Sequence, residues 1–250
     1  MGIRLKTTLD PNLYTQIGLD SGALTMLGTI VHRVKEAGQY RGALHVGPEV
    51  KAVFSVSAED DSPAAQATVD LSRLERLPAA PLSATDEGCC GGEAKGSSGG
   101  HRYTVNPRGY LLFHVSSGAG GYYVHLRRVD APDGDKGYDT RTLSGGDLFT
   151  AMILRPGRYS IVNALARSRT EAVVHYPRVG EKAYVPAAPL RVECTANGLE
   201  HPGRLELGVG QGLIFHAQVP ARIEIRLETP DDGPERPLKK RSGYRKGDQL

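Results

Sequence analysis

The sequence predicts an all-β protein, an antiparallel Greek-key sandwich preceded by a smaller β-rich N-terminal region. Glycine and proline are both frequent, at 31 and 16 of 250 residues, which suits many short strands joined by tight turns. Apolar and polar residues alternate with a period of two in residues 122–129 and 221–227, the pattern of strands with one wet face. A strand–turn–strand pattern also occurs three times, in residues 42–61, 109–133 and 212–232.

Residues 20–37 fit either a helix or a strand. Apolar residues recur there at helical spacing, at Leu24, Leu27, Val31 and Val34. Residues 29–34 are nevertheless rich in β-branched side chains, and Gly28 would interrupt a helix. We favour a strand that pairs with residues 40–46, because the segments that follow have strong β patterns.

Turn residues separate the other expected strands. Their spacing of 8–15 residues after residue 102, with Gly and Pro at the turns, favours a sandwich or a barrel. The expected strands are residues 42–46, 50–56, 67–71, 103–105, 110–116, 122–129, 147–154, 157–163, 172–176, 191–196, 204–209, 213–216 and 221–227.

A glycine-rich segment divides the chain. Six of the thirteen residues in 88–100 are glycine and none is a large apolar residue, so the segment cannot bury enough surface to offset its ordering entropy. We therefore expect a small β-rich domain over 1–85, a flexible linker or loop over 86–101, a β-sandwich over 102–232 and a basic disordered tail over 233–250.

Residues 154–161, Leu-Arg-Pro-Gly-Arg-Tyr-Ser-Ile, resemble the turn-and-strand signature of Greek-key sandwiches of the cupredoxin-like and carboxypeptidase-regulatory-like (transthyretin-like) kinds. Residues 192–215 are similar to the early strands of cupredoxins. The resemblance implies a sandwich. Copper cupredoxins have a Cys, His and often Met cluster just after this strand, whereas residues 162–166 contain no such ligand, so we expect no blue-copper site.

Three histidines end the first strand of each repeated pattern: His45, His114 and His216. Neutral imidazole is a good zinc or copper ligand, so a threefold arrangement of the patterns would create a metal site. The histidines are 69 and 102 residues apart, an uneven spacing that fits a threefold poorly. We favour histidines that end strands, with the metal site as the alternative.

Cys89 and Cys90 lie in the glycine-rich segment, eleven residues before His101. Two thiols do not complete a tetrahedral zinc site, so we favour incidental thiols in a linker. Copper or zinc binding by these residues is the alternative. Cys194 lies in an expected strand and is expected to be a buried small hydrophobe.

The charge distribution places the basic residues at the C-terminus. The formal net charge is +3, and residues 236–250 contribute six basic side chains against one acidic, or +5, so the remainder carries −2. This argues against a nucleic-acid-binding fold with a basic face. The tail suits a tether to an anionic partner, or else a solubilising end, through Lys239, Lys240, Arg241, Arg245 and Lys246.

No catalytic motif is present: the sequence contains no P-loop, Gly-x-Ser-x-Gly elbow or His-Glu-x-x-His run. We expect a non-catalytic binding or assembly module, an accessory or structural subunit whose partner is another protein or a second copy of the chain. The alternatives are a copper- or zinc-binding protein and an enzyme that acts on a carbohydrate or small molecule through a loop-built site. Because no signal-peptide pattern or bilayer-length apolar stretch is visible, we expect a cytoplasmic protein without a transmembrane segment.

Overall fold

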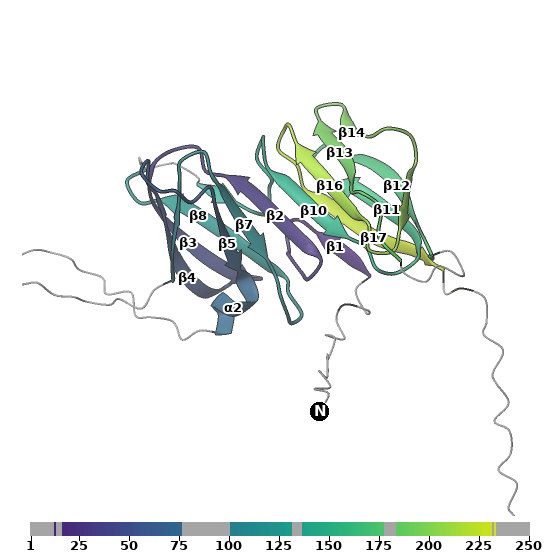
Figure 1. Cartoon of the computed structure of the whole chain (residues 1–250), viewed down its shortest axis with the longest axis horizontal. Helices are drawn as coiled ribbons and strands as arrows, with labels where there is room; N and C mark the ends of the chain where they lie inside the picture. The colour runs from purple at the N-terminus through teal and green to yellow at the C-terminus, as the bar shows by residue number, and fades with distance from the viewer. Residues whose placement is uncertain are drawn as a thin grey trace, which may run out of the picture.

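The computed structural model describes residue 13 and residues 17–76, 101–131, 137–177, 184–231 and 233. These residues form two lobes that lie side by side (Figure 1). One seven-stranded sheet, the central sheet, runs through both lobes, and a five-stranded sheet belongs to each lobe. The predicted all-β sandwich class is confirmed.

The strands are distributed over the three sheets as follows. The central sheet has the order β14 (Gly198–Glu200), β13 (Leu190–Thr195), β16 (Gly212–Ala217), β10 (Leu148–Met152), β2 (Gly28–Arg33), β7 (Tyr110–His114) and β5 (Gln66–Asp70). The sheet of lobe one has the order β6 (His101–Val105), β4 (Glu49–Ala58), β3 (Gly38–Val46), β8 (Tyr122–Arg128) and β9 (Tyr138–Asp139). The sheet of lobe two has the order β1 (Gly18–Asp20), β17 (Ile223–Pro230), β11 (Gly157–Asn163), β12 (Ser168–His175) and β15 (Leu205–Gly208). A short helix, α2 (Leu71–Arg76), follows β5.

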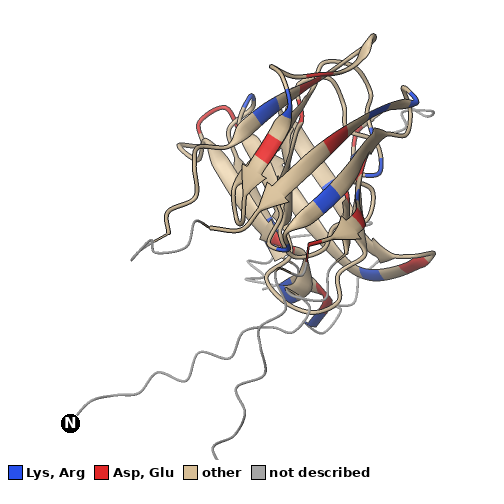
Figure 2. Cartoon of the chain, turned by 90° about the vertical axis from the view of Figure 1, so that its right-hand side faces the viewer, with Lys and Arg blue, Asp and Glu red and all other residues tan. Residues whose placement is uncertain are grey.

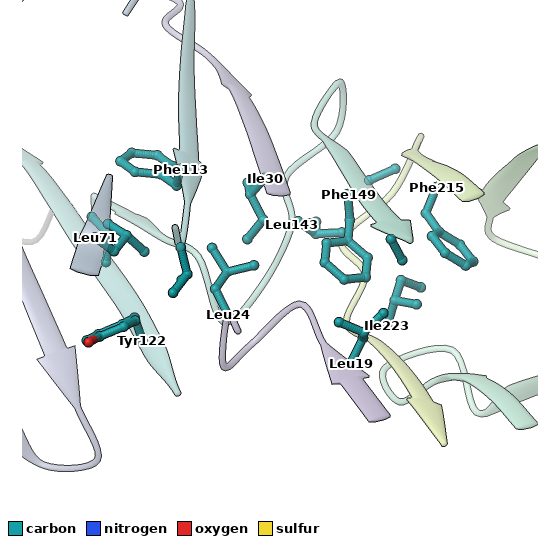
Figure 3. Packing of buried hydrophobic residues seen from close by; sticks show 14 of the residues in the cluster. Leu19, Leu24, Ile30, Leu71, Phe113, Tyr122, Leu143, Phe149, Phe215 and Ile223 are labelled. Carbon is teal, nitrogen blue, oxygen red and sulfur yellow. The ribbon is translucent and has the colours of Figure 1, made fainter. Parts of the chain in front are cut away.

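The alternation in the sequence produces one continuous core. In β8, for example, Tyr122, Val124 and Leu126 are buried. The buried hydrophobic side chains of all three sheets belong to a single cluster that passes from one lobe to the other (Figure 3). The largest fully buried aromatic side chains are Phe113, Phe149 and Phe215.

The two lobes repeat one strand topology. In lobe one, β3 pairs with β4 and β8, β4 with β6, and β7 with β2 and β5. In lobe two, β11 pairs with β12 and β17, β12 with β15, and β16 with β10 and β13. The strand directions also agree, because β4–β6, β5–β7, β12–β15 and β13–β16 are parallel while the other matched pairs are antiparallel. The sheets are therefore mixed, not purely antiparallel.

The first strand of each repeat joins the sheet of the other lobe. β1 precedes β2 but pairs with β17, and β9 precedes β10 but pairs with β8. A buried hydroxyl just after each exchanged strand accepts a backbone hydrogen bond: the Ile223 N–H donates to Ser21 Oγ at 2.9 Å, and the Val124 N–H donates to Thr140 Oγ1 at 2.8 Å. The described chain is thus two repeats, residues 18–128 and 138–230, with exchanged first strands.

The matching strand registers define pairs of equivalent residues. Each residue of β1, β2 and β3 is equivalent to the residue 119 positions later, in or next to β9, β10 and β11. Tyr40 and Tyr159 (159 − 40 = 119) illustrate the match, since each hydroxyl donates to a backbone oxygen four residues earlier at 2.8 Å. Ile30 and Phe149 (149 − 30 = 119) are also equivalent, and they lie opposite each other in the antiparallel β2–β10 pair. A local twofold axis therefore passes between Ile30 and Phe149 (Figure 3).

The strand favoured for residues 20–37 is present as β2, but its partner differs from the prediction. β2 pairs with β7 and β10 in the central sheet, whereas residues 40–46 belong to β3 in another sheet. Of the three repeated patterns, only the first is a hairpin, β3–β4. In the other two patterns the strands lie in different sheets, because β7 and β16 belong to the central sheet and β8 and β17 do not.

The strand pairing corrects the division expected between residues 1–85 and 102–232. β4 pairs with β6 and β5 with β7, so strands on both sides of the glycine-rich segment build lobe one. The chain passes instead from lobe one to lobe two between β9 and β10. The expected linker lies outside the described residues except for its last residue, His101, which begins β6, and the expected tail lies outside them except for Gly233.

Gly42 carries a close cross-strand contact in lobe one. It lies opposite Phe54, and a β carbon at this position would be 2.2 Å from ring carbon Cζ of Phe54. We expect Gly42→Ala to lower the free energy of unfolding by about 1–3 kcal/mol, because the ring must leave its packed position. Urea unfolding measures this loss. Gly212→Ala is the control, since its β carbon would meet Pro189 at an ordinary 3.5 Å; equal losses in both variants would contradict the explanation.

Candidate functional site

A polar pocket lies where β9 joins lobe one. It has a volume of about 200 Å³ and is called the polar pocket below. Its walls come from both repeats, because β2, β3 and β8 belong to the first repeat while β9 and Ser144 belong to the second. The lining residues are His32, Arg33, Val34, Lys35, Glu36, Tyr40, Leu126, Arg128, Gly137, Tyr138 and Ser144.

A buried histidine–carboxylate pair supports one wall of the polar pocket. His32 Nδ1 lies 2.8 Å from Asp147 Oδ1, and the Ser144 N–H donates to Asp147 Oδ2 at 2.7 Å. Asp147 is 1% exposed and His32 is 9% exposed, so the pair is almost dry. Because a carboxylate oxygen accepts hydrogen bonds, we assign a proton to His32 Nδ1, which then donates the hydrogen bond to Asp147.

Tyr138 covers the face of the His32 ring. The two rings are stacked with their centroids 3.5 Å apart and their planes 12° apart. Burial, with the Asp147 carboxylate nearby, raises the pKa of the Tyr138 hydroxyl well above its usual value, so the hydroxyl keeps its proton. The Asp147 carboxylate lies close enough to this buried hydroxyl to act on its pKa as an acceptor, although the two groups do not meet in full hydrogen-bond geometry.

The charged groups around the polar pocket are unequally paired. Arg128 binds both oxygens of Asp130, at 2.7 and 2.8 Å, and its Nη1 lies 2.6 Å from Glu36. The hydrogen bonds to Asp130 raise the pKa of Arg128. Arg33 and Lys35 are exposed, and neither forms an ion pair within the described residues. Within the described part of the chain, these two positive charges at the polar pocket therefore have no ion-pair partner.

The equivalent position in lobe two has an apolar pocket of only about 20 Å³. The register makes Leu19 the equivalent of Tyr138, Ala151 the equivalent of His32, and Gly28 the equivalent of Asp147. Met152 and Leu154 take the places of Arg33 and Lys35. The apolar pocket is lined by Leu13, Gly18, Leu19, Leu27, Met152, Ile153, Leu154, Arg155, Tyr159 and Ile225.

The two equivalent pockets show which residues of the polar pocket the fold does not require. A buried charge is costly unless it is paired, and apolar replacements of a buried pair are often neutral or stabilising. Lobe two forms the same topology with Ala151 and Gly28, so the fold does not require His32 and Asp147 at this site. The polar pocket is therefore the strongest candidate functional site among the described residues.

The three histidines proposed as metal ligands do not come together. His114 and His216 are equivalent and lie on the central sheet, where β2 and β10 separate their strands. Three strand spacings amount to about 14 Å, too far for one metal ion. His45 belongs to β3 in the sheet of lobe one and stacks on Tyr123 with centroids 4.7 Å apart. No metal-binding group of His, Cys, Asp and Glu occurs in the described residues.

The two matched histidines each face an acidic residue. His216 Nδ1 lies 2.7 Å from Glu193 Oε2, and the equivalent His114 is close enough to Asp70 to help lower the pKa of that carboxyl. Burial opposes this decrease, while hydrogen bonds from Ser116 and Ser72 provide most of it. Because the arrangement occurs in both repeats, we interpret it as part of the fold.

The other predicted site residues are divided between described and undescribed parts of the chain. His101 begins β6, opposite Phe54. Cys89, Cys90 and the basic residues Lys239, Lys240, Arg241, Arg245 and Lys246 lie outside the described residues. Cys194 is buried as expected, and burial raises the pKa of its thiol to about 12.

The visible face of lobe two mixes both signs of charge (Figure 2). In the sheet of lobe two, acidic and basic side chains approach each other in the pairs Arg158–Glu171, Arg169–Glu228 and Arg226–Glu224, on strands β11, β12 and β17.

Comparisons with family models, curated proteins and solved structures give no match. No helix in the described part of the chain combines the length and apolar character needed to cross a membrane.

The sequence analysis did not identify His32, Asp147 or Tyr138. A signal was present: residues 20–40 and 139–159 share Asp20/Asp139, Leu24/Leu143, Gly38/Gly157 and Tyr40/Tyr159 at a constant spacing of 119. Alignment of these segments places His32 opposite Ala151 and Asp147 opposite Gly28. The site is marked by polar residues of one repeat whose aligned residues in the other repeat are small or apolar.

Proposed function

We propose that the protein is a non-catalytic binding module whose ligand site is the polar pocket. The observation that carries this proposal is the difference between the two equivalent pockets. One has a volume of about 200 Å³ and is lined largely by polar and charged side chains, whereas the other has about 20 Å³ and is lined mostly by apolar ones. The larger volume lies below the roughly 300–1,000 Å³ of drug-sized sites, so it suits a small polar metabolite.

The residues of the polar pocket support binding better than catalysis. His32 is held by Asp147 and stacked by Tyr138, which orients its ring. A general base also needs a nucleophile or substrate proton within reach, and no described side-chain contact of His32 supplies a nucleophile. Arg33 and Lys35, which have no ion-pair partner within the described residues, suit recognition of polar ligand atoms, as does the buried Tyr138 hydroxyl.

Tyr138→Phe tests the site without disturbing its shape. A buried hydroxyl without a partner costs about 1–3 kcal/mol, so its removal is expected to leave the free energy of unfolding unchanged or higher. In thermal-shift titrations with neutral, cationic and anionic small metabolites, at least one compound should raise the melting temperature of the wild type. The same compound should stabilise Tyr138→Phe several-fold less.

Tyr110→Phe is the matched control, because Tyr110 is 41% exposed on the central sheet and does not line the polar pocket. Its ligand response should equal that of the wild type. Proton NMR of the recovered ligand should show an unchanged compound. The proposal fails if no compound stabilises the wild type, if Tyr138→Phe responds like Tyr110→Phe, or if the ligand is converted.

A further inference from the structure

The strongest additional feature of the polar pocket is its charge. Arg33 is the last residue of β2 and Lys35 follows two positions later, and both line the polar pocket together with His32. The other cation in the lining, Arg128, already contacts Asp130 and Glu36. Among the described lining residues Glu36 is the only one with a carboxylate, and it contacts Arg128, so neither Arg33 nor Lys35 has an ion-pair partner within the described residues.

The buried groups of the polar pocket add hydrogen-bond donors to this charge. The Tyr138 hydroxyl keeps its proton, and although the Asp147 carboxylate is near it, the two groups do not meet in full hydrogen-bond geometry. Asp147 is absent from the lining, and its two oxygens already accept from His32 and Ser144. A ligand oxyanion would accept from Tyr138 and pair with the two cations, because charge-assisted hydrogen bonds are stronger than neutral ones.

The equivalent residues show that this charge is not needed for folding. Met152 and Leu154 replace Arg33 and Lys35 in lobe two. Leu227 occupies the position of Arg128, since these two residues lie opposite the equivalent Tyr159 and Tyr40. A cationic ligand would face three positive side chains, and a neutral ligand would leave two of them unpaired.

Resting on the proposed function, we infer that the polar pocket binds a small oxyanion, a carboxylate or phosphate compound of metabolite size. Arg33 and Lys35 supply the counter-charge at the entrance, and Tyr138 donates a hydrogen bond from the buried wall. The two cations are specificity residues for the charge of the ligand.

The test compares the full-length wild type with the double variant Arg33→Gln/Lys35→Gln. Isothermal titrations use inorganic phosphate, succinate and the uncharged isostere succinamide as probes, at low and high salt. We expect phosphate or succinate to bind the wild type at least tenfold more tightly than succinamide, and the preferred anion identifies the oxyanion class. The double variant should lose at least tenfold in affinity for that anion, and raised salt should weaken wild-type binding.

Arg102→Gln/Arg127→Gln is the charge-matched control, because it removes two exposed cations that do not line the polar pocket. It should bind the anion like the wild type. The inference is overturned if the control loses as much affinity as Arg33→Gln/Lys35→Gln, or if neither anion binds more tightly than succinamide.

The failure of the inference can be told from the failure of the proposed function. A neutral or cationic metabolite that stabilises the wild type but not Tyr138→Phe would keep the binding module and reject the oxyanion. If no compound of any charge stabilises the wild type more than it stabilises Tyr138→Phe, both the proposed function and the oxyanion inference are wrong.

Discussion

Replacement of Asp147 alone by alanine is expected to lower the free energy of unfolding by about 3–5 kcal/mol, as for other buried pairs from which one partner is removed. The variant leaves the His32 Nδ1–H and the Ser144 N–H without the carboxylate that accepts from both. Water reaches this position poorly, since Asp147 is 1% exposed. Equilibrium denaturation in urea measures the loss.

The double variant His32→Ala/Asp147→Ala provides the decisive comparison. It gives the site nearly the same side chains as the equivalent site in lobe two, where Ala151 and Gly28 occupy these positions. We expect the double variant to be at least as stable as Asp147→Ala, so that the cycle gives a coupling energy of about 1–3 kcal/mol between the two side chains. Strictly additive losses would show that the pair is not energetically coupled.

Phe149→Ala should destabilise both lobes, with a loss of about 3–5 kcal/mol in the free energy of unfolding. Phe149 is fully buried, stacks on Phe215 with centroids 5.9 Å apart, and lies opposite Ile30 at the local twofold axis. The central sheet passes from one lobe to the other at this pair. A cavity there weakens contacts on both sides of the axis.

Hydrogen–deuterium exchange resolves the effect by lobe. We expect faster exchange in β3 of lobe one and in β12 of lobe two, together with a single unfolding transition. Leu165→Ala is the control, because Leu165 is 51% exposed and should change stability by less than about 0.5 kcal/mol. Faster exchange confined to lobe two would show that the lobes unfold independently.

Local patterns in the sequence predicted the strands well. Residues 157–163 coincide with β11, and residues 122–129 and 213–216 correspond to β8 and β16. The period of two is a property of neighbouring residues, so it can be read without knowledge of the partners. The short strands β1, β9 and β14 were not predicted, because two or three residues are too few to show a period.

Strand partners could not be predicted in the same way. β2 was expected to pair with residues 40–46, its neighbours in sequence, but it pairs with β7 and β10. The glycine-rich segment was interpreted as a boundary, yet β4 and β6 pair across it. A flexible composition shows that a segment has little to bury, and it carries no information about whether the strands on its two sides meet.

The candidate site was missed for a related reason. His32 and Asp147 are 115 residues apart and belong to different repeats. His45, His114 and His216 end similar strands and therefore look alike in the sequence, although only His114 and His216 are equivalent. The repeat that contains the site information begins at β1 and β9, whose exchange between lobes no local pattern reveals.

The all-β class, most of the strands and the burial of Cys194 follow from the amino-acid sequence, because side-chain periodicity and hydrophobicity act within short segments. The exchange of first strands between two copies of one topology, and the meeting of His32, Tyr138 and Asp147 beside the polar pocket, are visible only in the folded chain. Strand pairing depends on hydrogen bonds between distant segments. The identity of the partner is therefore settled by how the whole core packs, not by the residues of either strand alone.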